Sequence, residues 1–138
     1  MKLIILFLIF ISCTIPEQDL KYIPKEVTAN DTLTKLINNE RQNRNLNPLQ
    51  SETLLISLSK IKAIQMESQN QLNHNGFTNL ETHTETFGQI VGYGYNNEIS
   101  LFNAYMYSPN HRQDILGSYT HIGSYTVNGY NCVIFAKY

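Results

Sequence analysis

The sequence has few charged side chains, and their charges nearly cancel. Charged residues make up 15% of the 138 residues, with ten Lys and Arg against eleven Asp and Glu, so the formal net charge is −1. Proteins that bind nucleic acid need clustered Lys and Arg to neutralise phosphates. Nucleic acid is therefore excluded as the main partner. Much of the polar surface must come from uncharged side chains, including sixteen Asn.

Tryptophan is absent, and cysteine is limited to Cys13 and Cys132. If Cys13 carries a lipid, as argued below, Cys132 has no partner within the chain, and the domain folds without a disulfide. Cys132 lies in an apolar, strand-like segment, where a buried structural thiol is expected. Hydrophobic residues make up 42% of the chain, which is enough for a packed core without such a cross-link.

The N-terminal apolar segment is too short for a membrane-spanning helix. It covers residues 3–11, whereas a spanning helix needs about 20 apolar residues. Lys2 precedes the segment and Ser12-Cys13 follows it, which is typical of a secretory signal peptide. A small residue before Cys also resembles the lipobox of bacterial lipoproteins. We therefore expect residues 1–12 to be removed and Cys13 to be acylated, with an ordinary signal peptide cut elsewhere as the alternative.

The remaining sequence divides into a tether and one domain. Residues 13–30 are polar, contain Pro16 and Pro24, and are interpreted as a lipid-anchored tether. Residues 31–138 have the patterns of helices and strands. Helices are predicted from residues 31 or 32 to about 45, from a cap at Ser51 to about 71, and from about 97 to 107, followed by a short helical turn to 116.

The predicted strands lie toward the C-terminus. Residues 121–127 and 130–137 are strand-like and joined by Asn128-Gly129, the strongest short signal for a β-hairpin. Residues 87–95 contain three glycines and are consistent with a short strand or an irregular crossover. Asn45 is expected to close the first helix, because Asn tolerates the left-handed conformation. Helices first and a hairpin last predict an α+β fold.

Four segments carry sequence patterns that belong together. They are LINNER and LNPL at 36–41 and 46–49, KAIQM at 62–66 followed by His74, YMYSPNHRQDIL at 105–116, and YTHIGSY at 119–125. In this order they resemble the CAP superfamily, also called the SCP or pathogenesis-related-1-like domain, over residues 33–138. The resemblance implies an α-β-α sandwich with a shallow cleft, in which two His and two acidic residues typically lie.

The resemblance also implies which residues line that cleft. His74 and His111 match the His pair, through which some members bind a divalent metal, often zinc. Glu85 is the nearest candidate for the Glu of the family's Gly-Glu-Asn motif, although the flanking Gly and Asn are missing here. His83 is an accessory candidate in the same acidic loop. Tyr105 takes the place of the family's Trp, and we expect its ring to be buried with a hydrogen-bonded hydroxyl.

The residues themselves do not specify a hydrolase. No Gly-x-Ser-x-Gly elbow is present, and Cys132 lies in an apolar strand instead of a polar, accessible niche. Members of the family act through protein partners outside the cell or bind sterols or lipids, and proteolysis has been proposed for some. We expect a non-catalytic binding or interaction module, anchored to the cell envelope through a lipid on Cys13, with an extracellular protein or lipid as its ligand.

Two other functions remain open from the sequence. One is a metal-assisted hydrolase, in which His74, His111 and Glu85 hold zinc or another divalent ion with water in the open position. The other is a carrier of a sterol or fatty acid in an apolar groove.

Overall fold

The computed structural model of the chain describes residues 31–75 and 85–138. The predicted signal peptide, Cys13, the tether and His83 lie outside these residues. The described elements, in chain order, are α1 (Asp31–Asn43), β1 (Gln50–Ser51), α2 (Thr53–Ser68), β2 (Thr86–Tyr93), α3 (Glu98–Tyr107), α4 (Pro109–Ile115), β3 (His121–Val127) and β4 (Tyr130–Lys137).

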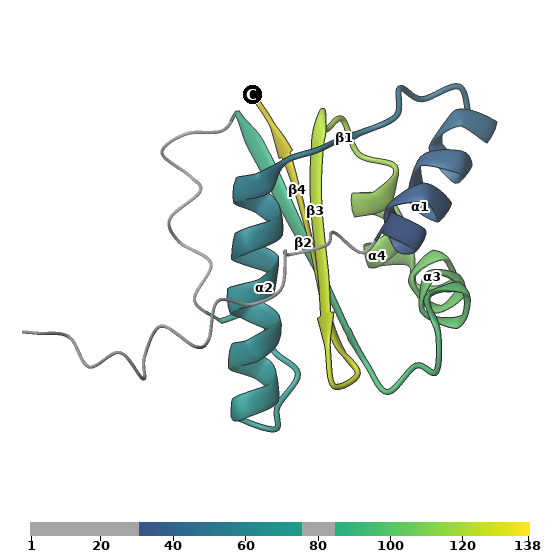
Figure 1. Ribbon diagram of the computed structural model, residues 1–138. Coiled ribbons are helices and arrows are strands. Elements are labelled where there is room, and N and C mark those ends of the chain that lie inside the picture. Colours follow the sequence, from purple (N-terminus) through teal and green to yellow (C-terminus); the bar gives the residue numbers. More distant parts are fainter. Residues whose placement is uncertain (1–30, 76–84) are drawn as a thin grey trace, which may run out of the picture.

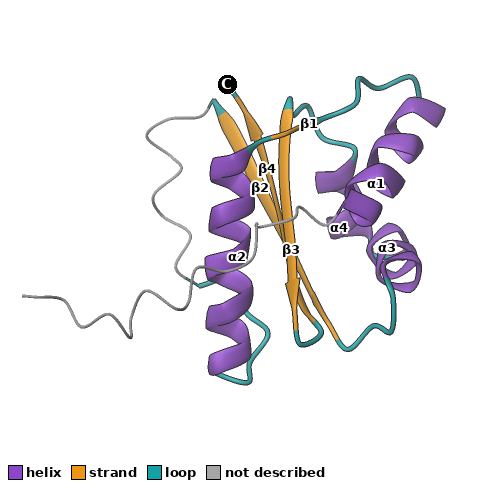
Figure 2. Cartoon of the chain, in the orientation of Figure 1, coloured by secondary structure: helices purple, strands orange, loops and turns teal. Residues whose placement is uncertain are grey.

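The helices and the sheet form three layers. The four described strands make one sheet in the order β1-β3-β4-β2. Helix α2 covers one face of this sheet, and α1, α3 and α4 cover the other (Figure 1). Figure 2 shows the strands between the two helical layers. The α+β class and the α-β-α sandwich expected from the sequence are confirmed.

The C-terminal hairpin has the predicted bounds. Strands β3 and β4 pair antiparallel from His121 opposite Ala136 to Val127 opposite Tyr130. Asn128 and Gly129 have φ angles of 45° and 83°. A tight hairpin turn of this kind needs positive φ at both central residues, which Asn-Gly tolerates. Both buried clusters of apolar side chains, one on each face of the sheet, draw on β4.

Helix α2 begins later and ends earlier than predicted. Glu52 is its N-cap and accepts hydrogen bonds from the backbone N–H groups of Leu54 and Leu55. Ser51 lies in β1 instead, paired with Ile122, so the predicted cap at Ser51 is wrong. Because Ser51 pairs with Ile122 of β3, the helix begins only after it. A strand of two residues is too short to be recognised from periodicity.

Helix α2 is buried on one side only. Leu54, Ile61 and Ile64 are exposed, at 49%, 65% and 43%. The helix lies so close to β3 that a Cβ on Gly123 would be 2.2 Å from the backbone carbon of Leu55. This close approach buries one stripe of the helix and leaves the opposite stripe in solvent. No described helix is long and apolar enough to cross a membrane.

Strand β2 is regular and lies at one edge of the sheet. It pairs antiparallel with β4 over its whole length, from Thr86 opposite Lys137 to Tyr93 opposite Tyr130. The irregular crossover considered for this segment is therefore not formed. Strand β2 has β4 on one side and no described strand on the other. The loop after α2 and helix α4 reach it from opposite faces of the sheet.

The end of α1 is held by a buried arginine. Arg41 is 2% exposed, and its Nη1 donates to the carbonyl oxygens of Ile115 and Gly117 at 2.8 and 2.9 Å. Its Nε donates to the carbonyl of Asn47 at 2.9 Å. Asn45 has a φ of 59°, as predicted for the residue that closes this helix. These bonds fix the turn after α1 and the end of α4 in one arrangement.

Candidate functional site

His74 and Gln89 meet beside the edge strand. His74 is exposed and follows α2, and its Nδ1 lies 2.9 Å from Oε1 of Gln89 in β2. The Gln89 amide also reaches inward, because its Nε2 lies 3.7 Å from Sγ of the buried Cys132. The side chain of Gln89 therefore spans from the exposed imidazole to the core.

His111 approaches from the other face of the sheet. It lies in α4, which begins at Pro109, and its ring makes an edge contact with the buried ring of Tyr105 at 5.1 Å between centroids. Burial lowers the pKa of His111, and the charge of nearby His74 lowers it further, while Asp114 acts in the opposite direction. His111 is therefore neutral at pH 7, because its ordinary value is already 6.5.

Asp114 is a carboxylate whose pKa responds to the charges of both histidines. Burial raises its pKa, whereas a hydrogen bond from Tyr119 and the charges of His111 and His74 lower it. The Tyr119 hydroxyl lies 3.5 Å from Oδ1 of Asp114. Gly88 makes room for this pair, since a Cβ there would lie 2.5 Å from the Tyr119 hydroxyl oxygen. Asp114 is not among the site residues expected from the sequence.

Glu85 lies apart from this cluster. Its Oε2 forms an ion pair with Nζ of Lys137 at 2.6 Å, and its side chain is 61% exposed. The side chain beside His74 is instead the amide of Gln89, which follows Glu85 by four residues. The sequence did not point to Gln89 as a site residue.

Among the described residues, no group of three or more His, Cys, Asp or Glu is arranged to hold a metal ion. The Nδ1 atom of His74 lies against Gln89, which leaves Nε2 as the ring nitrogen that could bind an ion. His83, the accessory candidate, lies outside the described part of the chain. Binding of a divalent metal by His74 and His111 therefore stays a prediction.

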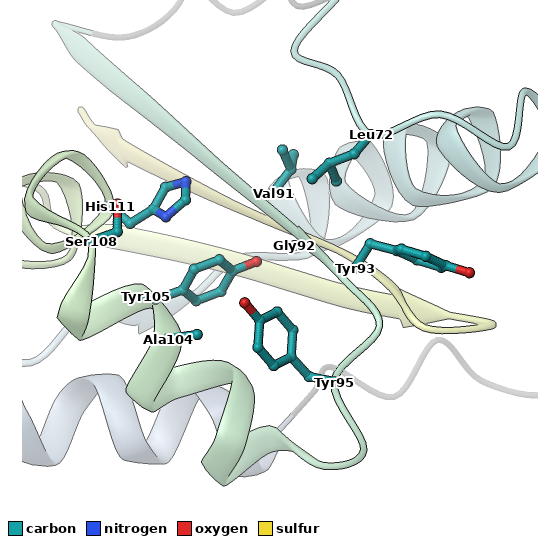
Figure 3. A pocket seen from close by; sticks show the side chains of 9 residues that line it. All are labelled: Leu72, Val91, Gly92, Tyr93, Tyr95, Ala104, Tyr105, Ser108 and His111. Carbon is teal, nitrogen blue, oxygen red and sulfur yellow. The ribbon is translucent and has the colours of Figure 1, made fainter.

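A hollow of about 200 Å³ opens beside this cluster. It is lined by Leu72, Val91, Gly92, Tyr93, Tyr95, Ala104, Tyr105, Ser108 and His111. Figure 3 shows Val91 and Leu72 on one side of β2 and His111 and Tyr105 on the other, with the hydroxyl ends of Tyr95 and Tyr105 pointing toward one another. The lining contains no carboxylate, Lys or Arg, and His111 is neutral at pH 7. The hollow is therefore uncharged.

Tyr105 forms the floor of the hollow. It is 2% exposed, and its hydroxyl donates to Oδ1 of Asn131 at 2.7 Å. The expectation of a buried ring with a hydrogen-bonded hydroxyl is confirmed. Asn131 is itself buried, and its Nδ2 donates to Oγ1 of Thr126 at 2.9 Å.

The nucleophilic side chains near the cleft are not activated. Cys132 is fully buried, as expected from its strand, and burial raises its pKa to about 12. A thiol with so high a pKa is not a nucleophile at neutral pH. Ser108 joins α3 to α4, and no hydrogen bond connects its hydroxyl to His111 within the described residues.

Comparison with known proteins gives one family. The sequence model of the CAP family, described as the cysteine-rich secretory protein family, matches residues 34–136. No curated protein sequence matches the chain.

Three solved structures share the fold. An outer surface protein from Borrelia burgdorferi has a TM-score of 0.69 and 22% identity, over 78% of this chain and 90% of that one. A cysteine-rich secretory protein from Staphylococcus aureus has a TM-score of 0.72 and 24% identity, over 78% and 38%. An extracellular protein with an SCP domain from Bacillus anthracis has a TM-score of 0.74 and 16% identity, over 92% and 45%. The chain thus spans less than half of each of the last two proteins.

Proposed function

The chain belongs to the CAP family of cysteine-rich secretory proteins, and from that premise we propose that it is a non-catalytic binding module that works outside the cytoplasm. Its binding site is the cleft beside β2, which takes an uncharged group of its ligand. The module is carried on the cell envelope by a lipid on Cys13.

The lining of the hollow is the observation that carries this proposal. Tyr93 and Tyr95 are 51% and 44% exposed, so their rings offer accessible surface at its mouth, while Tyr105 closes the floor. Aromatic rings offer apolar surface together with a hydroxyl that can hydrogen-bond. A lining without charges favours an uncharged ligand group, because a charge entering it would lose water without gaining a partner.

The size of the hollow limits what can enter it. Pockets that bury drug-sized ligands hold about 300–1,000 Å³. The hollow here holds about 200 Å³ and is open to solvent. It suits a single side chain or a group of similar size, and it does not suit a whole sterol or fatty acid.

The groups around the hollow support binding without catalysis. A hydrolase that uses His74 as a general base would gain from a carboxylate that orients the imidazole, as in catalytic triads. Gln89 supplies a neutral amide at that position, and Glu85 is paired with Lys137. Cys132 and Ser108 lack the activation that a nucleophile needs.

The location outside the cytoplasm is supported by the family and by the N-terminal sequence. The matching family is described as secretory, and two of the proteins with similar structures are described as an outer surface protein and an extracellular protein. The apolar residues 3–11 followed by Ser12-Cys13 have the pattern of an export signal with a lipidation site. Acylation of Cys13 would attach the domain to a membrane through its N-terminal segment.

The test fills the hollow and measures binding of small uncharged compounds. N-acetyl-leucine amide and N-acetyl-tyrosine amide are titrated into the full chain, and NMR chemical shifts of Val91, Gly92 and His111 report binding. Ala104→Leu narrows the hollow and should weaken binding at least several-fold. Asn103→Leu, on an exposed position of the same helix, should leave binding unchanged.

Two results would contradict this function. Shifts that appear elsewhere, or that Ala104→Leu does not reduce, would mean that the hollow is not the binding site. Hydrolysis of a defined peptide mixture that depends on zinc, and that is lost in the His74→Ala/His111→Ala double variant, would make the protein a metal-assisted hydrolase.

A further inference from the structure

A second hollow lies next to the cleft, beside the turn of the C-terminal hairpin. It holds about 170 Å³ and is open to solvent. Its walls come from the loop after β2, the start of α3 and the hairpin, and they consist of Tyr95, Asn96, Asn97, Glu98, Leu101, Thr126 and Gly129. Tyr95 lines this second hollow and the hollow of the cleft, so its side chain stands between the two. The binding function proposed above leaves the second hollow unused.

The loop that forms most of the second hollow is fixed at both ends. The N–H of Gly94 donates to the carbonyl of Gly129 at 3.2 Å and joins the loop to the hairpin turn. Both glycines have positive φ, at 84° and 83°, a conformation that glycine adopts at little cost. At the other end, Oδ1 of Asn97 accepts from the N–H of Ser100 at 2.9 Å and caps α3. A ligand therefore meets a wall that is already ordered, which lowers the entropic cost of binding.

The asparagines at this end of the molecule have amide groups left over for a ligand. Asn97 uses its Oδ1 for the cap, and its Nδ2 makes no hydrogen bond with another described residue. Asn96 is exposed, and neither end of its amide is bonded within the described part of the chain. Each amide offers two donors and one acceptor. The wall of the second hollow therefore presents donors and acceptors side by side.

Tyr95 supplies an aromatic face to the same hollow, and a second ring lies close by. Tyr95 is 44% exposed. Tyr93 stacks on Tyr130, with 4.2 Å between the ring centroids, and is still 51% exposed. Since Tyr130 covers one face of the Tyr93 ring, the exposed area includes the other face. A Cβ on Gly129 would lie 3.6 Å from Cε2 of Tyr93, so this ring adjoins the rim of the second hollow.

The charge of the second hollow selects against anions. Among the described residues that line it there is no Lys, Arg or His, and Glu98 is the one charged side chain. An anionic ligand would lose water and meet a carboxylate in place of a cation. Neutral hydroxyl groups, in contrast, donate to a carboxylate in hydrogen bonds stronger than those between neutral groups.

We propose that the second hollow binds a neutral saccharide, with one sugar ring stacked against Tyr95. This inference goes beyond the proposed function, because it adds a second site beside the cleft. A sugar ring has a face of C–H groups, which packs on the electron-rich face of an aromatic ring. Its hydroxyls both donate and accept, as the amides of Asn96 and Asn97 do. The exposed face of Tyr93 gives a second sugar unit a surface on which to stack.

Other classes of ligand match this surface less well. A sterol or an acyl chain would cover the amides and Glu98 without offering them hydrogen bonds, which costs free energy. An apolar side chain of a peptide would find little apolar surface, because Leu101 is only 5% exposed and the remaining large apolar group of the lining is the Tyr95 ring. A saccharide uses the ring and the polar groups together.

The experiment titrates neutral disaccharides into the full chain and records NMR chemical shifts. The probes are maltose, cellobiose, lactose and N,N′-diacetylchitobiose. At least one of them should shift the side-chain amides of Asn96 and Asn97 and the backbone amide of Gly129, with a Kd below about 10 mM. The saccharide that binds best is then used with the variants.

Paired variants separate recognition of the sugar from folding. Tyr95→Leu removes the aromatic face and should weaken binding about threefold to tenfold, whereas Tyr95→Phe keeps the face and should retain most of the binding. Asn96→Ala removes an amide that has no bond within the described residues, so it should weaken binding about threefold or more and leave stability unchanged. Asn103→Ala, at an exposed position of α3 outside both hollows, is the matched control and should bind as wild type does.

The outcomes distinguish the second hollow from the cleft. Binding that persists in Ala104→Leu, which narrows only the cleft, and falls in Tyr95→Leu supports a second site. Equal losses in these two variants would place the sugar in the cleft and overturn the inference. The absence of shifts with all four disaccharides, or unchanged binding in both Tyr95→Leu and Asn96→Ala, would also overturn it. In each case the binding of N-acetyl-leucine amide, read at His111, still tests the proposed function by itself.

Discussion

Tyr105 belongs to both the core and the candidate cleft. Its ring packs with the cluster that includes Leu101 and Ile115, its edge faces His111, and its hydroxyl donates to Asn131. The CAP family resemblance places a Trp at this position, and the indole N–H of a Trp would lie elsewhere. The Tyr found here is matched by a buried acceptor, Oδ1 of Asn131. The floor of the hollow is therefore held by a hydrogen bond as well as by packing.

The contribution of this hydrogen bond can be measured separately from that of the ring. Tyr105→Phe leaves Oδ1 of Asn131 without its donor and should lower the free energy of unfolding by about 1–3 kcal/mol. Tyr105→Ala should cost about 3–5 kcal/mol, as for other large core deletions. Tyr107 is 90% exposed, and Tyr107→Ala should change stability by under about 0.5 kcal/mol in the same denaturant titrations. A loss below that of Tyr107→Ala would contradict the burial of Tyr105.

Asp114 should make stability depend on pH. Its pKa is raised, chiefly by burial, so the folded state holds the proton more tightly than the unfolded chain. The protonated carboxyl therefore adds to the stability of the fold. This contribution is fully present below pH 3.8, the ordinary pKa, and is lost as the pH rises through the pKa of Asp114 in the folded protein. At neutral pH the ionised carboxylate therefore opposes folding.

Asp114→Asn removes this opposing charge. The variant should raise the free energy of unfolding at pH 7 by about 0.5–2 kcal/mol, the range typical of single stabilising substitutions. The gain should shrink as pH falls toward 3.8, where the wild-type carboxyl also becomes neutral. Denaturant titrations at several pH values measure this, and a variant less stable than wild type at pH 7 would show that the carboxylate stabilises the fold.

Sequence reasoning found some site residues and missed others for a physical reason. His74, His111 and Tyr105 are candidates because the segments that contain them resemble segments of the CAP family. Gln89 and Asp114 lie near the histidines only because β2 contacts both the loop after α2 and helix α4. These segments are far apart in the chain. Nothing in the local sequence separates the paired Glu85 from a cleft carboxylate.

At the scale of elements, α2 and the loop that follows it act together. Lys62 of α2 is 3% exposed, and its Nζ donates to Oδ1 of Asn73 and to the carbonyl of Asn75, both at 2.6 Å. These two residues flank His74. The buried ammonium group therefore fixes the loop that presents His74 to Gln89, and burial lowers the pKa of Lys62.

Removing this ammonium group should loosen the loop and leave the helix in place. In Lys62→Met, residues 73–75 should exchange amide hydrogens faster, and the ring signals of His74 should shift in NMR spectra. The free energy of unfolding should fall by about 1–3 kcal/mol, since buried acceptors lose their donor. Lys60→Met, on the same helix with Nζ 5.5 Å from the Tyr125 ring, serves as the control. Unchanged His74 signals in Lys62→Met would contradict the positioning role.

Elements with strong local signals were predictable, and those defined by distant partners were not. The Asn-Gly hairpin, α1 and α3 lie within a few residues of their predicted bounds, because turn and capping residues act locally. Strand β1 is defined only by its pairing with β3. The exposed stripe of α2 results from the close packing of this helix against Gly123 of β3. Both depend on tertiary contacts that periodicity does not contain.

At the scale of the whole molecule, attachment to a membrane is expected to depend on Cys13. Two or more acyl chains give stable attachment, whereas the domain alone offers no described helix that spans a membrane. Cys13→Ala should move the full chain from the detergent phase to the aqueous phase and abolish labelling by radioactive fatty acid. Cys132→Ala is the matched control and should still partition into detergent. Equal partitioning of wild type and Cys13→Ala would contradict the anchor.

The central claim is that the cleft binds an uncharged ligand and does not catalyse its hydrolysis. The most direct measurement incubates the full chain, with and without zinc, with a defined mixture of uncharged synthetic peptides. Mass spectrometry then records both the peptides retained by the protein and any fragments. We predict that intact peptides are retained, that Ala104→Leu weakens retention at least several-fold, and that no fragments appear. Fragments that form with wild type and disappear with His74→Ala/His111→Ala would contradict the claim.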